Sequence, residues 1–148
     1  MATFTQIVYH VVFAAKDRRP VFHKENREEL FRYLTGVLKR RQSLLFVING
    51  VEDHLHILTT LHPSVALADL VKDLKVSSSG WIKRKQLFPG FKGWQDGFAA
   101  FTCSARERKN VIRYIENQEE HHRRRTFREE FVAMLKLAGV EYDDRYLP

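Results

Sequence analysis

The amino-acid sequence predicts an α+β fold built on one antiparallel sheet. Short runs of β-branched and aromatic residues alternate with longer segments whose apolar residues recur every three or four positions. A polar break of two residues separates the second β-prone run from the third, which indicates a tight antiparallel connection. The resulting order, β-α-β-β-α-β followed by helices, is typical of a ferredoxin-like sheet with two helices on one face.

The first half of the chain carries three strands and one helix of this pattern. Residues 6–14 are rich in valine and aromatic side chains, so they are the expected first strand. Residues 26–41 place leucine, phenylalanine and valine at helical spacing with charges between them, which predicts a helix. Residues 44–51 and 54–61 are the second and third strands, and Glu52-Asp53 is the polar break that joins them.

The second half begins with another helix and a strand. The apolar spacing predicts a helix from Val65 to about Lys85, with Ser64 as its N-cap. The run from Ser77 to Gly80 is expected to break or kink this helix, because serine and glycine are poor helix formers. Residues 94–103 then form a fourth strand or a hairpin.

Two further helices are expected after the sheet. Ser104 is placed to cap a long helix that runs to about His121, with Glu107 three residues later to close a capping box. A short last helix covers about Phe127 to Leu137 and ends at Gly139. The sequence thus adds a C-terminal pair of helices to the six elements of the ferredoxin-like pattern.

The composition indicates one globular domain spanning residues 1–148. This length can bury a core without disulfides, and 44% of the residues are hydrophobic. No apolar run is long enough to cross a membrane and the N-terminus lacks a basic signal start, so we expect a cytoplasmic protein without a membrane partner. The single cysteine, Cys103, agrees with a reducing compartment and is expected to be a small buried residue.

The charge of the chain favours a polyanionic partner. Twenty-five Lys and Arg residues outnumber eighteen Asp and Glu residues, which gives a formal net charge of +7. Because such an excess attracts polyanions, nucleic acid is the first candidate partner. The basic residues form four short clusters spread along the chain, which indicates a patch assembled by folding. These clusters are residues 16–19, 38–41, 83–85 and 121–125.

Two histidines lie one residue apart at the start of the third strand. Residues two apart in a strand point to the same face, so His54 and His56 present their imidazoles side by side. Leu55 and Ile57 then point to the opposite face, where helices can cover them. Paired imidazoles suit a divalent metal ion. Two ordinary histidines on a sheet are the simpler interpretation, so the pair needs further partners.

The long helix predicted after the sheet supplies candidate partners. Tyr114 and Gln118 are four residues apart, which places them on one helix face about a turn apart. Gln118 offers a carbonyl oxygen to a metal ion, and Tyr114 offers a phenol near the same ion. An aromatic core residue beside a solvated glutamine would give the same spacing.

Taken together, these residues resemble the single-tyrosine HUH transposases of the smallest bacterial insertion sequences, which include the REP-associated tyrosine transposases. His54-Leu55-His56 matches the His-hydrophobic-His motif, and Tyr114 with Gln118 matches the tyrosine helix. The resemblance covers essentially the whole chain in the right order. Further similar stretches are YHVVFAAKDRRPVF (9–22), VSSSGWI (76–82), WQDGF (94–98) and EYDDRYL (141–147).

The resemblance implies a metal-dependent transposase that acts on single-stranded DNA. Tyr114 would attack a phosphodiester next to a hairpin end and form a 5′-phosphotyrosine intermediate, which a second strand then attacks to rejoin the DNA. His54, His56 and Gln118 would bind a divalent metal, Mg²⁺ or Mn²⁺. Because the intermediate keeps the bond energy, no nucleotide cofactor is expected.

The resemblance also implies partners and a place of action. We expect single-stranded DNA with hairpin ends, a homodimer, and a bacterial cytoplasmic protein associated with the nucleoid. Whether the tyrosine helix serves its own or the partner's histidines stays open. Trp81 and Trp94 could stack on extruded bases, although burial of at least one is expected. The candidate DNA contacts are Arg18, Arg19, Lys83, Arg84 and Lys85.

Several alternatives stay open. His121 or His122 could be a third histidine ligand, although the three arginines that follow indicate a helix end that contacts phosphate. The protein could be a domesticated hairpin-binding protein that no longer cuts DNA, or a related HUH nickase. An RNA-binding ferredoxin-like domain would need aromatic residues on its central strands. A two-histidine phosphoesterase needs two His-x-Ser/Thr motifs, and only residues 62–64 fit one.

Overall fold

The fold is built on a four-stranded antiparallel sheet with the strand order β2-β3-β1-β4. The computed structural model describes residues 1–148. Strands β1 and β3 occupy the two central positions, so helices can cover them on both faces. This order confirms the predicted ferredoxin-like α+β fold. The strands are β1 (Val8–Ala14), β2 (Leu45–Gly50), β3 (His54–Thr60) and β4 (Ala99–Thr102).

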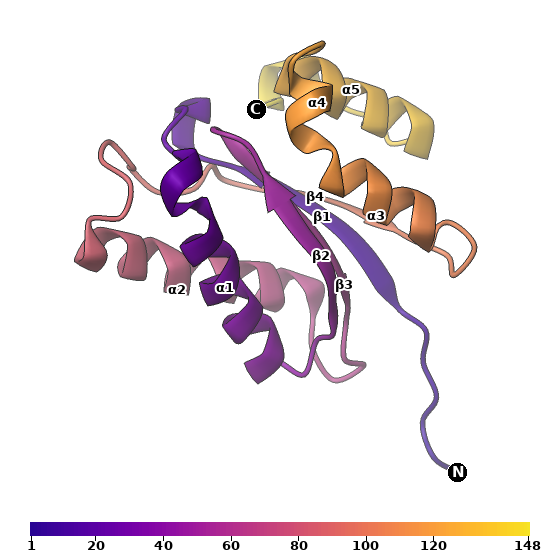
Figure 1. Ribbon diagram of the computed structural model, residues 1–148. Coiled ribbons are helices and arrows are strands. Elements are labelled where there is room, and N and C mark those ends of the chain that lie inside the picture. Colours follow the sequence, from indigo (N-terminus) through magenta and orange to yellow (C-terminus); the bar gives the residue numbers. More distant parts are fainter.

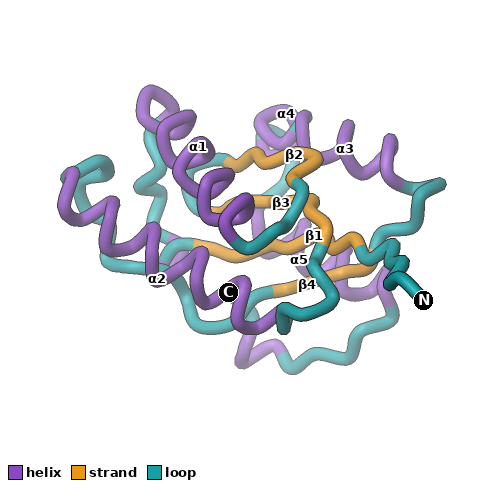
Figure 2. Tube along the Cα trace, turned by 90° about the horizontal axis from the view of Figure 1, so that it is seen from below, coloured by secondary structure: helices purple, strands orange, loops and turns teal.

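Helices lie on both faces of the sheet, as Figure 1 and Figure 2 show. The long helices α1 and α2 cover one face, as predicted for the two connecting helices. The shorter helices α3, α4 and α5 cover the other face. None of the helices combines the length and the apolar character needed to cross a membrane. The helices are α1 (Lys24–Arg40), α2 (Leu67–Lys85), α3 (Arg108–Glu116), α4 (Gln118–His122) and α5 (Phe127–Ala138), with the 3-10 helices η1 (Lys16–Arg18) and η2 (Asp144–Tyr146).

The main core lies between the sheet and helices α1 and α2. Leu55 and Ile57 of β3 are fully buried there against the apolar stripes of both helices. The predicted burial of these two side chains is therefore confirmed. The alternate residues of β3, His54 and His56, consequently point to the opposite face, toward α4 and α5.

The prediction of one continuous helix from Ser104 to His121 was wrong at its start. Ser104 and Glu107 do form the predicted reciprocal bonds, because each backbone N–H donates to the other side chain at 3.1 and 3.2 Å. This turn precedes the regular helix, which begins only at Arg108.

The same helix is also interrupted at Asn117, which separates α3 from α4. The side-chain amide of Asn49 on β2 donates to the carbonyl oxygens of Ile115 and Glu116 at 2.9 and 3.1 Å. These bonds hold the end of α3 against β2. The helix is bent here (Figure 1) and restarts at Gln118, whose side chain is fully buried.

Two details predicted for α2 were wrong. The helix begins at Leu67, and Ser64 instead shares a 2.7 Å hydrogen bond with the Nδ1 atom of His62 in the preceding turn. The serines do not break α2, which is continuous from Leu67 to Lys85, and the hydroxyl of Ser78 donates to the carbonyl oxygen of Leu74 one turn earlier at 2.6 Å.

The elements that flank the tyrosine helices follow the prediction more closely. Regular pairing in β4 covers only residues 99–102, and Trp94 makes an isolated bridge with Ala15. Helix α5 has a capping box between Thr126 and Glu129, and it ends at Gly139 with a φ of 69°. Cys103 is buried, as predicted.

Candidate active site

The two histidines of β3 are buried beneath α4 and α5. His54 and His56 are each 0% exposed and stand opposite Ala14 and Val12 of β1. Their Nε2 atoms face one point, the Oε1 atom of Glu130 on α5, at 3.2 and 3.1 Å. The structure therefore brings the two imidazoles to a common centre.

The second nitrogen of each imidazole is held by a separate partner. His54 Nδ1 lies 2.7 Å from the Oδ1 atom of Asp53. His56 Nδ1 lies 2.8 Å from the Nε2 atom of His10, a buried residue of β1 whose ring stacks on His56. A partner on Nδ1 fixes the ring orientation and leaves Nε2 for the centre of the site, as is usual for imidazoles that bind metals.

Helices α3 and α4 bring the other two predicted residues to the same centre. The hydroxyl of Tyr114 donates to the Oε2 atom of Glu130. The Nε2 atom of Gln118 donates to the same oxygen at 3.1 Å. All four predicted site residues, His54, His56, Tyr114 and Gln118, therefore surround one carboxylate. In this structure the tyrosine helix lies over the histidines of its own chain.

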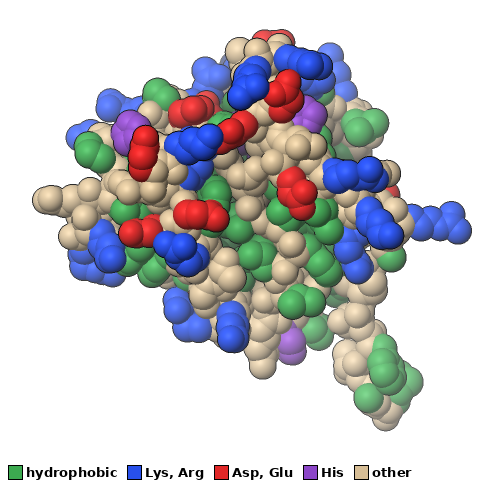
Figure 3. Space-filling view, in the orientation of Figure 1, with side chains coloured by type: hydrophobic (Ala, Val, Ile, Leu, Met, Phe, Trp, Pro, Cys, Tyr) green, Lys and Arg blue, Asp and Glu red, His purple; other side chains and the backbone are tan.

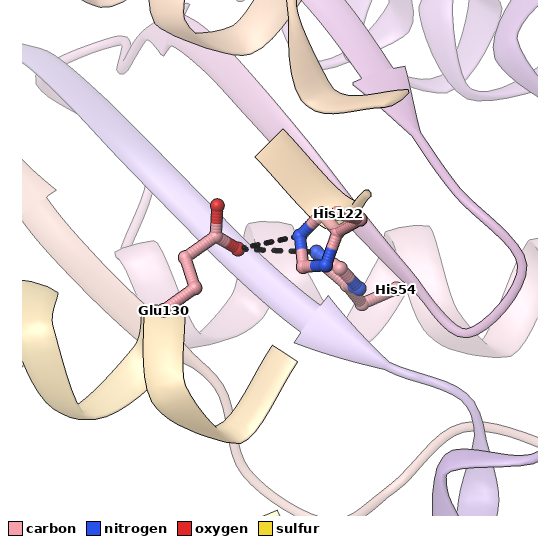
Figure 4. Close-up of side chains that lie close together, drawn as sticks. All are labelled: His54, His122 and Glu130. Atoms are coloured by element: carbon pink, nitrogen blue, oxygen red, sulfur yellow. Dashed lines mark hydrogen bonds and ion pairs between the residues drawn. The ribbon is translucent and has the colours of Figure 1, made fainter. Parts of the chain in front are cut away.

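Two residues of this centre were not assigned from the sequence. Glu130 is 1% exposed and contacts all four predicted site residues, and His122 Nε2 lies 3.1 Å from its Oε1 atom. Figure 4 shows His54, His122 and Glu130 pointing toward one another from three different elements. Glu130 lies in the first turn of α5, where an acidic residue is ordinarily a helix-dipole partner. Nothing in the local sequence indicated that it faces the histidines.

The role of His10 could have been found from strand parity. His10 and Val12 are two apart in β1, and Val12 stands opposite His56, so all three side chains share one face. The predicted first strand already contained this histidine. Finding its role would also have required the pairing of the first strand with the third, because the sequence of one strand does not show which strand lies beside it.

Burial and mutual contacts shift the ionisation of the cluster. Burial, assisted by the nearby His56, lowers the pKa of His10 to about 3, and burial lowers the pKa of His56 to about 4. Burial would also lower the pKa of His54, but contacts with Asp53 and Glu130 outweigh it and raise that pKa.

The two acids of the cluster shift in opposite directions. Burial would raise the pKa of Glu130, but its contacts with the histidines outweigh burial and hold that pKa far below its usual range. Burial and the charge of Glu130 raise the pKa of Tyr114. At neutral pH the cluster therefore holds an ionised carboxylate beside a neutral phenol.

Acidification is expected to destabilise the metal-free protein. The pKa of His56 falls from 6.5 to about 4 on folding, so the unfolded chain binds more protons than the folded protein between these pH values. The free energy of unfolding therefore decreases as the pH is lowered through this range. For His56 alone the full decrease is about 3 kcal/mol. His10 acts in the same direction. His54 partly offsets the loss, because its raised pKa contributes stability below pH 6.5 that disappears above it.

Urea unfolding in a chelator between pH 7 and pH 4 would measure this loss. A His10→Leu variant should show a weaker pH dependence than the wild type, because one buried titrating group is removed. The exposed His23→Asn variant should follow the wild type. Equal stability at both ends of the pH range would contradict the expectation.

A polar crevice of about 700 Å³ opens beside His122. Four arginines line it, Arg18 of η1 and residues 123–125, together with the carboxylates of Asp17, Glu52, Asp53 and Glu129. Figure 3 shows Lys and Arg side chains over α4 and α5, with Asp and Glu side chains between them. Arg19 follows Arg18 and is exposed. The structure thus places one predicted DNA contact, Arg18, next to the histidine cluster.

The other predicted basic contacts lie elsewhere. Residues 83–85 are exposed at the C-terminal end of α2, which covers the opposite face of the sheet (Figure 1). Trp81 on the same helix stacks on Tyr33 with ring centroids 4.4 Å apart. Trp94 packs against Phe13 in the core, and its Nε1 atom donates to the hydroxyl of Ser78 at 2.9 Å. Both tryptophans are only partly buried against the main core, so the expected burial of at least one is met only in part.

An apolar hollow of about 880 Å³ lies on the other side of Tyr114, between β4, α3 and α5. Phe101, Met134 and Leu137 are among its apolar lining residues, and His10 and Glu130 also line it. Tyr114 and Glu130 therefore border both this hollow and the centre of the histidine cluster.

The donor atoms of the cluster fit a divalent metal ion. Two imidazole nitrogens, His54 Nε2 and His56 Nε2, face one carboxylate oxygen of Glu130, and the amide of Gln118 faces the other. The Oε1 atom of Gln118 and the Nε2 atom of His54 are both buried and take part in no hydrogen bond. Because buried polar atoms are rarely left unpaired, these two atoms mark places where a cation would supply the missing partner.

Comparison with known proteins gives a consistent result. Residues 3–118 match the family described as IS200-like transposases. The chain is 26% identical over 120 residues to the ISDra2 transposase TnpA of Deinococcus radiodurans, which covers 78% of this chain and 86% of that protein.

Two solved structures are also similar. A crystal structure of a candidate transposase from Deinococcus radiodurans has a TM-score of 0.59 and 27% identity, and the match covers 80% of this chain and 95% of that one. The structure of a REP-associated tyrosine transposase bound to a REP hairpin has a TM-score of 0.62 at 15% identity, over 82% of this chain and 74% of the other. The second likeness concerns the fold alone.

Proposed function

Because the chain belongs to the family of IS200-like transposases, we propose that it cuts and rejoins single-stranded DNA next to hairpin ends, with Tyr114 as the nucleophile. The observation that carries this proposal is the meeting of a phenol with paired imidazoles. The hydroxyl of Tyr114 and the Nε2 atoms of His54 and His56 contact the same buried carboxylate. A phosphate held at the imidazoles would therefore lie within reach of the phenol.

The proposed reaction has two transfers at phosphorus. The Oη atom of Tyr114 attacks the scissile phosphate, the bond to the 3′ oxygen breaks, and a 5′-phosphotyrosine and a free 3′-hydroxyl result. The 3′-hydroxyl of a second strand then attacks the phosphotyrosine, joins the strands and releases Tyr114. One phosphodiester is exchanged for another, so no nucleotide cofactor is required.

Tyr114 has to lose its proton before or during the attack. Its raised pKa keeps the phenol neutral at pH 7 while it donates to Glu130. The phenol must therefore leave Glu130 as it turns toward the phosphate. A bound Mg²⁺ or Mn²⁺ would polarise the phosphate and favour the ionised phenol. His54, His56 and the free Oε1 atom of Gln118 would hold that cation.

The DNA would approach through the polar crevice, along its arginine side chains. Arg18 and residues 123–125 line it beside His122 and can contact backbone phosphates. The apolar hollow beyond Tyr114 could receive a base that flanks the cut. Residues 83–85, at the basic end of α2, lie apart from the crevice and the hollow and would contact a more distant part of the hairpin. Arg19, which follows η1, would also contact the hairpin.

The assembly and location follow from the same proposal. Residues 1–148 would act as one transposase domain, and a homodimer would hold the two DNA ends that are to be joined. The REP-associated relative is bound to a hairpin, which supports hairpin DNA as the partner. An enzyme that acts on bacterial chromosomal DNA would work in the cytoplasm, at the nucleoid.

The polarity of cleavage tests this proposal. We would incubate the protein and Mn²⁺ with a hairpin oligonucleotide labelled at either end, then separate the products in SDS. The 3′ label should migrate with the protein, because tyrosine keeps the 5′-phosphate, and the 5′ label should be released. A 5′ label in the adduct would contradict the mechanism. Hairpin binding without any adduct would indicate a domesticated binding protein instead.

Replacing Arg18 or Arg125 in the crevice by alanine should lower the affinity for DNA and make that affinity less dependent on salt. Neither Arg18 nor Arg125 takes part in an ion pair, so both guanidinium groups can contact phosphate. Each Arg→Ala change should reduce the slope of log K against log salt by about 1. Arg32 is an exposed arginine on α1, and Arg32→Ala is the matched control. Equal losses in all three variants would indicate a general charge effect.

A further inference from the structure

Helices α4 and α5 add two donors to the histidine centre, His122 and Glu130. His122 Nε2 and His54 Nε2 lie 3.1 and 3.2 Å from the Oε1 atom of Glu130. The ligand atoms of these three residues all lie within 4.8 Å of one another (Figure 4). We propose that His122 and Glu130 are further ligands of the divalent cation, in addition to His54, His56 and Gln118. The inference rests on the proposed function, because it concerns the same cation.

The spacing of the donor atoms is that of ligands around one ion. With metal–ligand bonds of about 2.1 Å, neighbouring ligand atoms lie about 3.0 to 3.4 Å apart. The nitrogen-to-oxygen distances from Glu130 to His54, His56 and His122 are 3.1 to 3.2 Å. Three imidazoles from two elements thus stand at ligand spacing around a carboxylate from a third.

Hydrogen bonding alone does not satisfy this cluster. The Oε1 atom of Glu130 has hydrogen bonds with His56 and His122 at 3.1 Å each, which occupy its two lone pairs. His54 Nε2 lies close by but is left without a hydrogen bond, and so is the Oε1 atom of Gln118. Both residues are 0% exposed, so water cannot reach them freely. A cation among these atoms would bind the imidazole lone pair and the amide oxygen together.

The added donors define the kind of cation. Mg²⁺ favours oxygen ligands and retains several waters, whereas imidazoles favour transition metals. A centre with His54, His56 and His122 beside one carboxylate is therefore expected to prefer Mn²⁺ or Zn²⁺ to Mg²⁺. His122 and Glu130 lie beyond residues 3–118, the part of the chain that matches the family. Their contribution is thus a property of the C-terminal helices of this chain.

Mn²⁺ binding to the full chain without DNA tests the inference independently of activity. Electron paramagnetic resonance would report free Mn²⁺ during titration of the wild type and of Glu130→Gln and His122→Asn. We expect the Kd for Mn²⁺ to rise at least about tenfold in both variants. The matched controls are Glu116→Gln and His23→Asn, which change exposed residues and should bind like the wild type.

A second measurement needs no variant and is unaffected if one fails to fold. Pulsed electron paramagnetic resonance on the Mn²⁺-loaded wild type counts coordinated imidazole nitrogens. The inference requires three such imidazoles, whereas a centre limited to His54 and His56 would have two. A count of two would overturn the assignment of His122.

The outcomes separate this inference from the proposed function. If His54→Asn abolishes Mn²⁺ binding while Glu130→Gln and His122→Asn bind normally, the proposed function stands and the inference fails. Tighter Mn²⁺ binding in Glu130→Gln would also overturn it, because the carboxylate would then compete with the cation. If His54→Asn binds Mn²⁺ like the wild type, the cation site of the proposed function is itself wrong.

Discussion

Replacing Tyr114 by phenylalanine is expected to abolish the covalent protein–DNA adduct and to reduce strand cleavage by about 10³-fold or more. The change removes one hydroxyl from a half-buried side chain and leaves its ring contacts with His56 and His121. None of the other four tyrosines lies at the imidazoles. Tyr9 packs against the main core, Tyr33 stacks on Trp81 on the opposite face of the sheet, and Tyr142 and Tyr146 are exposed near the C-terminus.

The measurement is an SDS gel of labelled hairpin DNA after incubation with Mn²⁺. Hairpin affinity of Tyr114→Phe should stay close to that of the wild type, because the phenol is not needed for phosphate contacts in the crevice. Tyr146→Phe is the matched control and should form the adduct normally. An undiminished adduct in Tyr114→Phe would refute the assignment of the nucleophile.

Replacing His56 by alanine is expected to remove cleavage but to leave much of the hairpin binding. The imidazole contacts both Glu130 and His10, so its loss removes two contacts within the centre. We expect a loss of cleavage of about 10²-fold or more, since this group would both bind the cation and orient the phosphate. Hairpin binding depends mainly on basic side chains outside the centre.

Cleavage and hairpin affinity should be measured on the same preparation, together with a thermal unfolding curve. The curve is needed because the substitution leaves a cavity and an unpaired His10 in a buried region. His62→Ala, at a half-exposed turn, is the control. If a folded His56→Ala protein lost hairpin affinity as severely as cleavage, the separation of binding from chemistry would be wrong.

Strand and helix periodicity explain how much of this centre could be predicted from the sequence. The two-residue period of β3 predicted that His54 and His56 share a face, because alternation is a local property of an extended chain. The four-residue spacing of Tyr114 and Gln118 similarly predicted a shared direction. Here the bend at Asn117 separates them into two helices, and both still reach the same carboxylate.

The amino-acid sequence by itself determined the order of the elements, the pairing of imidazoles on one strand and the family to which the chain belongs. Only the tertiary structure decided that Glu130 and His122 join the centre and that His10 supports His56. These contacts link residues 46 and 74 positions apart, in the pairs His10–His56 and His56–Glu130. Their physical origin is the docking of whole helices on the sheet, which depends on packing along each element and is not encoded in any short segment.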